Sequence, residues 1–261
     1  MTHPRDDPYS RVDYRRMVAW PERIARERPL LESFARRAPD PSVVDLGCGT
    51  GEHALFLASL GLRTVGVDRS ETQLGKAREL QDAHPPHGPR VLLGDVRALD
   101  ELTDERFGAA IALGNGLPSL EDADLDRALT ALARRLVPGG GLLIQILNYE
   151  RILGRGVRHL PLNFRGEPGT DGEAVFLRLM TAHGDRHVLF HPTTLALHPG
   201  SEPPVTVEAT KEVRLRAWRR TELEARLEAN GFSVEAVWGD MTGGRYEAAE
   251  SSDLVVAAMR P

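Results

Sequence analysis

Apolar residues recur with two different periods along the middle of the chain. Between Ser42 and Asn148, short apolar runs alternate with longer segments whose apolar residues have helical spacing. The runs predict strands at residues 42–46, 63–67, 91–93, 109–113 and 142–147. The segments between them predict helices at residues 52–60, 70–81 and 123–136. Strands that alternate with helices in this way are typical of a parallel, doubly wound sheet.

Local signals mark the ends of several helices. Ser70-Glu-Thr-Gln73 has the capping-box form that begins a helix. Pro138-Gly-Gly-Gly141 follows the helix at 123–136, and we expect it to stop that helix before the strand at 142–147 begins. Near the N-terminus, residues 18–37 carry apolar positions at helical spacing, with expected interruptions at Pro21 and Pro29.

The alternation stops after Asn148. Three strands without helices between them are predicted at residues 174–182, 187–197 and 205–218, so we expect an antiparallel addition there. Thr221-Glu-Leu-Glu224 then has capping-box form, and strands at 232–238 and 254–259 complete the sheet. The predicted organisation is an N-terminal helical segment at 1–41, a core at 42–149 and 219–261, and an insertion at 150–218.

Composition narrows the class of protein. The 261 residues are 41% apolar and 27% charged, as in an ordinary globular protein, and no apolar run is long enough to span a bilayer. No signal peptide is visible, and a single cysteine fits a reducing compartment, so we expect a cytoplasmic protein with no membrane partner. A net charge of −5 disfavours nucleic acid as a partner.

A glycine-rich loop follows the first predicted strand without a break. Gly47, Gly49 and Gly51 allow positive φ angles and let a ligand approach the backbone closely. The helix that starts near Glu52 presents free N–H groups to this loop. Such a turn suits a pyrophosphate, so a nicotinamide or flavin cofactor is one interpretation.

Three details favour S-adenosylmethionine over a dinucleotide. The glycine spacing is G-x-G-x-G rather than G-x-G-x-x-G. Asp45, two positions before the first glycine, would repel phosphate but accept hydrogen bonds from an ammonium group. Asp68 ends the second strand, where a carboxylate binds ribose hydroxyls. Asp95 and Val96 end the third strand and are placed to read an adenine edge, and Asn115 follows the fourth strand, beside the methionine part.

On these residues the chain resembles the class I S-adenosylmethionine-dependent methyltransferases, over residues 42–150 and 220–260. The resemblance implies a Rossmann-like, mostly parallel sheet of seven strands in the order 3-2-1-4-5-7-6, with strand seven antiparallel. It implies that Asp45, Gly47 and Gly49 line the methionine end, that Asp68 holds the ribose, and that Asp95 and Val96 meet the adenine. The neighbouring Cys48, Arg69, Leu113 and Asn115 complete the predicted cofactor site.

A narrower resemblance is to glycine N-methyltransferase and its sarcosine-methylating relatives. It rests on Asn148-Tyr149 after strand five, on the antiparallel insertion and on the arginine-bearing N-terminal segment. In that subgroup an arginine of the N-terminal segment binds the cofactor carboxylate, which nominates Arg23. The asparagine of the Asn-Tyr pair contacts substrate there, so Asn148 and Tyr149 are the predicted catalytic residues. The insertion does not align, so the identity of the substrate does not carry over.

Other chemistry-bearing residues have ordinary interpretations. Cys48 lacks an adjacent base, so we expect a small buried loop residue rather than a nucleophile. Four histidines at 183, 187, 191 and 198 lack a carboxylate or cysteine cluster, and no metal site is predicted. Arg165 and Arg178 lie in the insertion, where they could bind a carboxylate substrate bidentately or simply be solvated.

The sequence therefore predicts methyl transfer from S-adenosylmethionine to a small molecule, with an amine nitrogen favoured over oxygen because no acid–base dyad is evident. The alternatives are O-methylation of a small metabolite, a non-catalytic cofactor-binding module, and a nicotinamide-dependent oxidoreductase. The insertion is a candidate lid, substrate element or homodimer surface.

Overall fold

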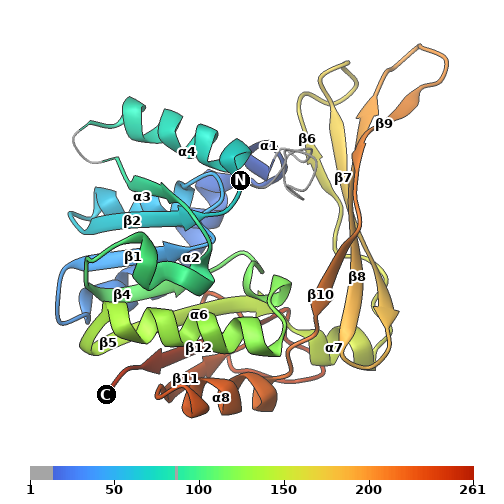
Figure 1. Ribbon diagram of the computed structural model, residues 1–261. Coiled ribbons are helices and arrows are strands. Elements are labelled where there is room, and N and C mark those ends of the chain that lie inside the picture. Colours follow the sequence, from blue (N-terminus) through green and yellow to red (C-terminus); the bar gives the residue numbers. More distant parts are fainter. Residues whose placement is uncertain (1–13, 86–87) are drawn as a thin grey trace.

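The computed structural model describes residues 14–85 and 88–261, so residues 1–13 of the predicted N-terminal segment lie outside the described part. A seven-stranded sheet forms its centre (Figure 1). The strands are β1 Ser42–Leu46, β2 Arg63–Asp68, β3 Arg90–Leu93, β4 Phe107–Ala112, β5 Leu136–Leu147, β11 Ser233–Trp238 and β12 Asp253–Met259. Their order is β11-β12-β5-β4-β1-β2-β3, and β12 is antiparallel to both neighbours. This confirms the predicted sheet and its strand order.

Helices cover both faces of this sheet. They are α2 Trp20–Arg36, α3 Glu52–Ser59, α4 Glu71–Ala83, α5 Leu99–Leu102, α6 Asp122–Arg135 and α8 Arg220–Ala229. Successive strand residues point to opposite faces, so Val43 of β1 packs with Leu31 of α2. Val44, the next residue, belongs instead to the buried cluster on the opposite face, which includes Leu129 of α6 and Leu223 of α8. The core therefore has one apolar layer on each side of the sheet.

The predicted antiparallel addition is a second, five-stranded sheet. Its strands are β6 Asn163–Arg165, β7 Ala174–His183, β8 His187–Leu197, β9 Val205–Thr210 and β10 Val213–Arg216. The expected single strand at 205–218 is thus two strands, separated at residues 211 and 212. The short helix α7, Tyr149–Gly154, leads from the end of β5 toward this sheet, which therefore stands at the carboxyl ends of the parallel core strands (Figure 1).

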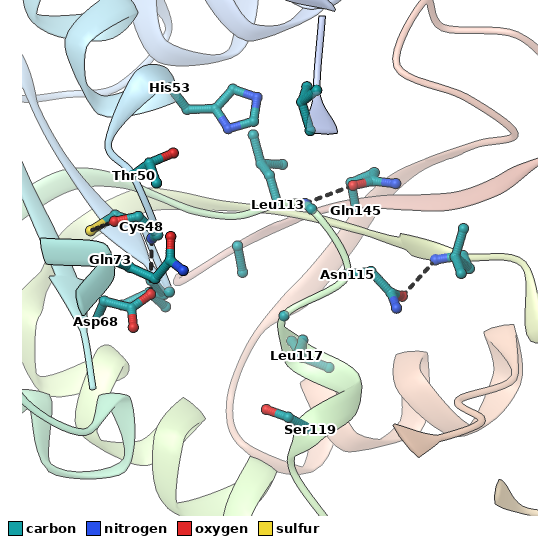
Figure 2. A pocket seen from close by; sticks show the side chains of 18 of the residues that line it. Cys48, Thr50, His53, Asp68, Gln73, Leu113, Asn115, Leu117, Ser119 and Gln145 are labelled. Atoms are coloured by element: carbon teal, nitrogen blue, oxygen red, sulfur yellow. Dashed lines mark hydrogen bonds between the residues drawn. The ribbon is translucent and has the colours of Figure 1, made fainter. Parts of the chain in front are cut away.

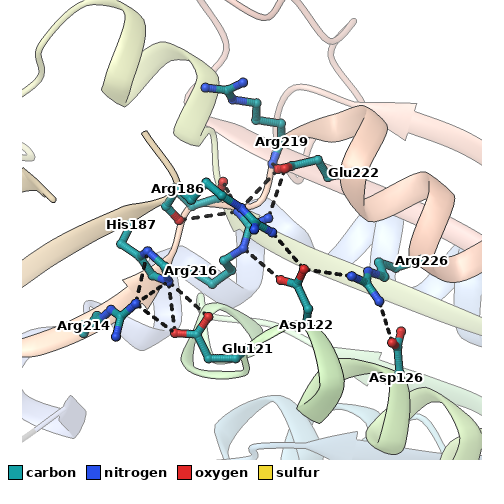
Figure 3. A network of polar contacts seen from close by, with 11 residues as sticks. Glu121, Asp122, Asp126, Arg186, His187, Arg214, Arg216, Arg219, Glu222 and Arg226 are labelled. Carbon is teal, nitrogen blue, oxygen red and sulfur yellow. Dashed lines mark hydrogen bonds and ion pairs between the residues drawn. The ribbon is translucent and has the colours of Figure 1, made fainter. Parts of the chain in front are cut away.

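A polar network joins the second sheet to helices α6 and α8 (Figure 3). Arg216, the last residue of β10, is only 2% exposed and pairs with Asp122 at 3.1 Å and Glu222 at 3.0 Å. Its guanidinium carbon also lies 4.3 Å from the ring centre of Trp218. Displacing this side chain would leave a buried charge without a partner, so the network fixes where the second sheet stands.

Two expectations about breaks in the chain were wrong. Helix α2 runs through both prolines: Pro21 sits in the first turn, where its missing N–H costs nothing, and Pro29 lies inside the helix. Buried Leu31 and Phe34 hold this helix to the sheet, so packing outweighs the lost hydrogen bond. Pro138-Gly-Gly-Gly141 lies within β5 rather than before it: Leu136 pairs with Phe107, and the ladder resumes at Gly141 opposite Ala109.

The two predicted capping boxes have different outcomes. The Ser70 hydroxyl accepts a hydrogen bond from the Gln73 N–H and begins α4, as predicted. Helix α8 instead begins at Arg220, one residue before the predicted cap, because the Glu222 carboxylate accepts the Arg219 N–H at 3.1 Å. Across the described residues, no helix combines the length and apolar character needed to cross a bilayer.

Candidate active site

The glycine loop after β1 requires its glycines. Gly47, Gly49 and Gly51 have φ angles of 76°, 55° and 87°, in the left-handed region that side chains disfavour. A Cβ atom at Gly47 or Gly49 would face open space, so the loop surface is free for a ligand. The Val67 carbonyl accepts hydrogen bonds from the Gly47 and Cys48 N–H groups at 2.8 and 3.1 Å, which fixes the loop against β2.

Asp68 holds the other side of this loop (Figure 2). One carboxylate oxygen accepts the Gly49 N–H at 2.9 Å and the other accepts the Ser70 N–H at 2.8 Å. These bonds fix the carboxylate at the end of β2, beside the cavity. Asp68 and the following Arg69 both line the cavity described below, as the sequence predicts.

Asp45 lies just behind the cavity wall, which begins at the next residue, Leu46. Its side chain is 2% exposed, and its Oδ2 atom has no hydrogen-bond partner among the described residues. Burial raises the pKa of Asp45 to about 8, and the charges of Asp68 and Glu52 add to the rise. An acid in this condition fits a cationic ligand, because an ammonium group at the loop would stabilise the ionised form. The predicted cofactor carries such a group.

Cys48 is a buried, unreactive residue of the same loop. Its side chain packs against Gly66 of β2, where an added Cβ would come within 2.7 Å of the sulfur. Burial raises the pKa of the thiol well above its usual value, and the nearby charges of Asp45 and Asp68 raise it further. A thiolate is therefore disfavoured, as the sequence interpretation expects.

Asp95 and Val96 also line the cavity, after β3. Burial alone would raise the pKa of Asp95, but hydrogen bonds from Arg97 lower it overall. The Asp95 carboxylate accepts the Arg97 backbone N–H and the Arg97 Nε, both at 2.9 Å, and so begins a single turn of helix at Val96. The hydrogen bonds from Arg97 therefore use much of the acceptor capacity of the Asp95 carboxylate, which the sequence predicts to meet the adenine.

Leu113 and Asn115 follow β4 and line the cavity (Figure 2). Asn115 has a φ of 65°, which is unusual for a residue with a side chain. Three hydrogen bonds hold it: its Nδ2 donates to the Tyr149 hydroxyl at 3.0 Å, its Oδ1 accepts the Leu147 N–H, and its own N–H donates to the Gln145 carbonyl. Its side chain is thus placed by the end of β5.

Asn148 and Tyr149, the predicted catalytic pair, do not line this cavity. Asn148 is 1% exposed and begins helix α7: its Oδ1 accepts the Arg151 N–H, and its Nδ2 donates to two carbonyls of the segment before β12. Tyr149 is equally buried and reaches the cavity only through its bond to Asn115. Both residues serve the backbone that shapes the cavity, and their polar atoms are occupied there.

Arg23, the predicted carboxylate ligand, enters the cavity from the first turns of α2. Its Nη2 atom lies 3.9 Å from where a Cβ of Gly114 would be, so it approaches the end of β4. Its Nε donates to Glu27 at 2.8 Å, and His53 of α3 contacts the same carboxylate at 2.8 Å. Burial lowers the pKa of His53, so the neutral ring donates to Glu27 and helps to hold Arg23.

The sequence interpretation missed this buried Glu27–His53 pair and also missed Asp253. Asp253 begins β12, lines the cavity, and has its pKa raised to about 6, chiefly by burial. Neither belongs to a recognisable motif: Glu27 and His53 are 26 positions apart, and Asp253 follows an exposed turn. Only the amphipathic pattern of α2, which puts Glu27 on its buried side, offered a signal.

These residues surround one cavity of about 550 Å³, a volume typical of small-ligand sites. One wall is formed by the glycine loop and the ends of β2, β3 and β4. The opposite wall belongs to the second sheet and its approach: Leu160, Asn163, Arg165, Arg178, Phe190, Val213 and Leu215. The predicted histidines are not part of it; His187, for example, contacts Glu121 at 3.0 Å in the network of Figure 3. No cluster of metal-ligating side chains occurs in the described ranges.

Comparison with known proteins gives the same class as the fold and loop. A family model described as a methyltransferase domain matches residues 43–140. The glycine/sarcosine/dimethylglycine N-methyltransferase of Actinopolyspora halophila is 30% identical over 141 residues, which are 54% of this chain and 25% of that protein. The trans-aconitate 2-methyltransferase of Deinococcus radiodurans is 32% identical over 170 residues, covering 63% of this chain and 60% of that protein. The two matches span 25% and 60% of the length of these curated relatives, less than two thirds of each.

Among solved structures, the CcbJ methyltransferase of Streptomyces caelestis superposes with a TM-score of 0.72 at 26% identity, covering 91% of this chain and 95% of that one. The seven-stranded sheet, the glycine loop after β1 and Asp68 at the end of β2 together form a Rossmann-like fold of the kind that binds nucleoside-containing cofactors. The methyltransferase-domain match, the N-methyltransferase relative and the solved structure support a class I S-adenosylmethionine-dependent methyltransferase. The predicted family and its cofactor are thereby confirmed.

Proposed function

We propose that this protein transfers a methyl group from S-adenosylmethionine to a nitrogen of a small-molecule amine. The observation that carries the proposal is the continuity of the cavity. It begins at the glycine loop and Asp68 and runs to the inner wall of the second sheet, within one volume of about 550 Å³. A cofactor on the first wall and an acceptor on the second would therefore meet in a common space.

On the cofactor wall, Asp68 is proposed to hold the ribose hydroxyls and Arg23 the methionine carboxylate. The backbone of Gly47 and Gly49 approaches the ligand, and Asp45 balances its ammonium group from behind. Val96 is proposed to lie against the adenine. When bound, S-adenosylmethionine supplies an electrophilic methyl group on a positively charged sulfur, so the protein's task is placement.

At the end of β4, facing the acceptor wall, Asn115 presents a polar side chain to the cavity, and Tyr149 acts as its positioning residue. Asp253 is proposed to attract the acceptor amine and to hold the proton that the amine loses, since its raised pKa suits proton exchange near neutral pH. The Nε2 atom of His53 is hydrogen-bonded to Glu27 and burial lowers the pKa of the ring, so this role is not assigned to His53. A nitrogen acceptor is supported by the N-methyltransferase relative named above.

O-methylation of a carboxylate is the second candidate. Two arginines, Arg165 and Arg178, line the acceptor wall, and the relative from Deinococcus radiodurans is named for a carboxylic acid substrate. Amine and carboxylate acceptors differ in which atom of the product carries the methyl group. A non-catalytic cofactor-binding module would produce neither product.

The test is a product assay with a defined panel. Purified protein is incubated with S-adenosylmethionine and small primary amines, amino acids, amino sugars or di- and tricarboxylic acids, and S-adenosylhomocysteine is quantified by mass spectrometry. We expect turnover with at least one amine, and we expect mass spectrometry to show that the product carries the transferred methyl group on its nitrogen. Methylation confined to the carboxylic acids would overturn the amine proposal, and cofactor binding without turnover on any class would favour the non-catalytic module.

Asp68→Asn gives the matched test of the cofactor wall. It keeps the shape of the side chain but removes the charge that organises Gly49 and faces the ligand. We expect S-adenosylhomocysteine to bind about ten-fold to a hundred-fold more weakly by calorimetry, as for a lost hydrogen bond to a charged group. Asp82→Asn, at an exposed position of α4, is the control and is expected to bind as the unaltered protein does.

A further inference from the structure

The acceptor wall carries an unusual pair of arginines. Arg165 of β6 and Arg178 of β7 both line the cavity. Because Arg165 pairs with Ala174, and residues 174, 176 and 178 share one face of β7, the two arginines lie on the same face of the second sheet. Phe176 on this face packs against Met17, a cavity residue, so the face points toward the core of the molecule.

Neither guanidinium has a carboxylate partner among the residues that the structure describes. Arg178 donates instead to the Pro161 carbonyl at 2.8 Å and to the Asn163 side chain at 3.3 Å, and Arg165 donates to the Phe164 carbonyl at 2.6 Å. The Nε atom of each arginine is enclosed and has no acceptor. Arg216 and Arg23, by contrast, each pair with a carboxylate.

The electrostatics are unfavourable without a ligand. Burial lowers the pKa of Arg178, and the positive charges of Arg165 and Arg23 lower it further. Enclosed donors without acceptors and like charges that face one another both cost free energy, so folded proteins seldom keep them without a partner. An anion placed close to both guanidiniums would offset their charges and accept hydrogen bonds from the N–H groups that the backbone and Asn163 leave unused.

Apart from Asn163, which accepts a hydrogen bond from Arg178, the rest of this wall is apolar. Leu160, Phe190, Val213 and Leu215 line it and carry no charge. The site therefore combines an apolar floor with two cationic forks. This pattern orients a ligand that has an apolar body and one anionic end.

We propose that Arg165 and Arg178 bind an anionic group, a carboxylate or a phosphate, carried by the methyl acceptor. The site holds the acceptor by its anionic end so that a separate part of the molecule reaches the cofactor wall. Only the identification of the ligand as the acceptor rests on the proposed function. Binding of an anion between the two arginines stands without it.

The experiment measures anion binding directly, on protein saturated with S-adenosylhomocysteine. Malonate and inorganic phosphate are titrated separately at constant ionic strength, with sodium chloride as the reference salt, and the thermal midpoint and calorimetric Kd are recorded. We expect malonate or phosphate to raise the midpoint above the chloride reference. The better ligand of the two identifies the anion as a carboxylate or a phosphate.

Four variants make the result specific. Arg165→Gln and Arg178→Gln are each expected to weaken anion binding about ten-fold or more, and Arg178→Lys less, because lysine keeps the charge but not the fork. Arg214→Gln removes an exposed arginine of β10 outside the cavity and is expected to bind anions as the unaltered protein does. Because Arg178 faces like charge, Arg178→Gln should unfold at a midpoint no lower than that of the unaltered protein in chloride.

Two results would overturn the proposal. One is equal protection by malonate, phosphate and chloride; the other is undiminished anion binding in both glutamine variants. The proposed function fails separately, if S-adenosylhomocysteine does not bind the unaltered protein. The same titration is then run without that ligand, and its outcome decides the anion site alone.

Discussion

Asp45→Asn tests whether the buried carboxyl of Asp45, near the end of β1, is protonated in the folded protein without cofactor. The side chain is 2% exposed with an enclosed, unpartnered oxygen, and its pKa rises from 3.8 to about 8 on folding. Between these values the folded chain binds more protons at this site than the unfolded chain does. The free energy of unfolding must therefore fall as pH rises through this window.

The size of this effect follows from the two pKa values. Each pH unit inside the window costs about 1.4 kcal/mol. Between pH 5 and pH 8 the loss at Asp45 is therefore on the order of 4 kcal/mol. Asparagine has nearly the same shape but does not titrate, so the variant should lack this slope while sharing every other pH-dependent contribution.

The assay is urea unfolding of both proteins at pH 5, 6, 7 and 8, compared as the difference in unfolding free energy at each pH. We expect Asp45→Asn to gain on the unaltered protein with each step, while Asp82→Asn, the exposed control, stays parallel to it. Saturating S-adenosylhomocysteine should flatten the slope of the unaltered protein, because its ammonium group favours ionised Asp45. Parallel curves for Asp45→Asn and the unaltered protein would refute the reasoning.

Three further predictions concern other parts of the molecule. Tyr149→Phe removes the hydroxyl that holds Asn115, so unfolding free energy should fall by about 1 kcal/mol and kcat by less than about ten-fold, whereas a Tyr149 acting on substrate would lose about a hundred-fold or more. Arg216→Met removes the cation that Asp122 and Glu222 share, while Arg186 and Arg226 still pair with Asp122, and should lower the unfolding free energy by about 2 kcal/mol in urea. An unchanged unfolding free energy would show that Arg216 does not hold the network together. If Asp253 accepts the proton of the amine, kcat/KM should rise as the pH passes through about 6, and Asp253→Asn should lose this rise. The same rise in the variant would mean that another group accepts the proton.

The cofactor wall was largely predictable because its signals are local in sequence. Gly47, Gly49 and Asp68 stand at strand ends, and parallel strands bring their carboxyl ends to one edge of the sheet. The alternation of strands and helices predicts a parallel sheet, and a parallel sheet places these three residues at the same edge. The inert character of Cys48 also followed from the absence of a neighbouring base.

The acceptor side depended on contacts between distant residues. Asn148 looked like a substrate ligand, but its amide donates to carbonyls of Ala248 and Ser251, about a hundred positions away. Glu27 meets His53 only because α2 and α3 pack together on one face of the sheet. No local pattern marks such pairs.

The sequence by itself determined the strands and helices of the sheet and the loop that lines the cavity, because periodicity and turn chemistry act between near neighbours. The strand order followed from the resemblance to the methyltransferase family. Only the tertiary structure decided which side chains face the cavity and which are used up in holding the backbone. Arg165 and Arg216 show the difference: both are arginines on strands of the second sheet, and nothing in the sequence separates them. Packing gives Arg216 two carboxylate partners and leaves Arg165 without one at the cavity, and burial makes that difference large.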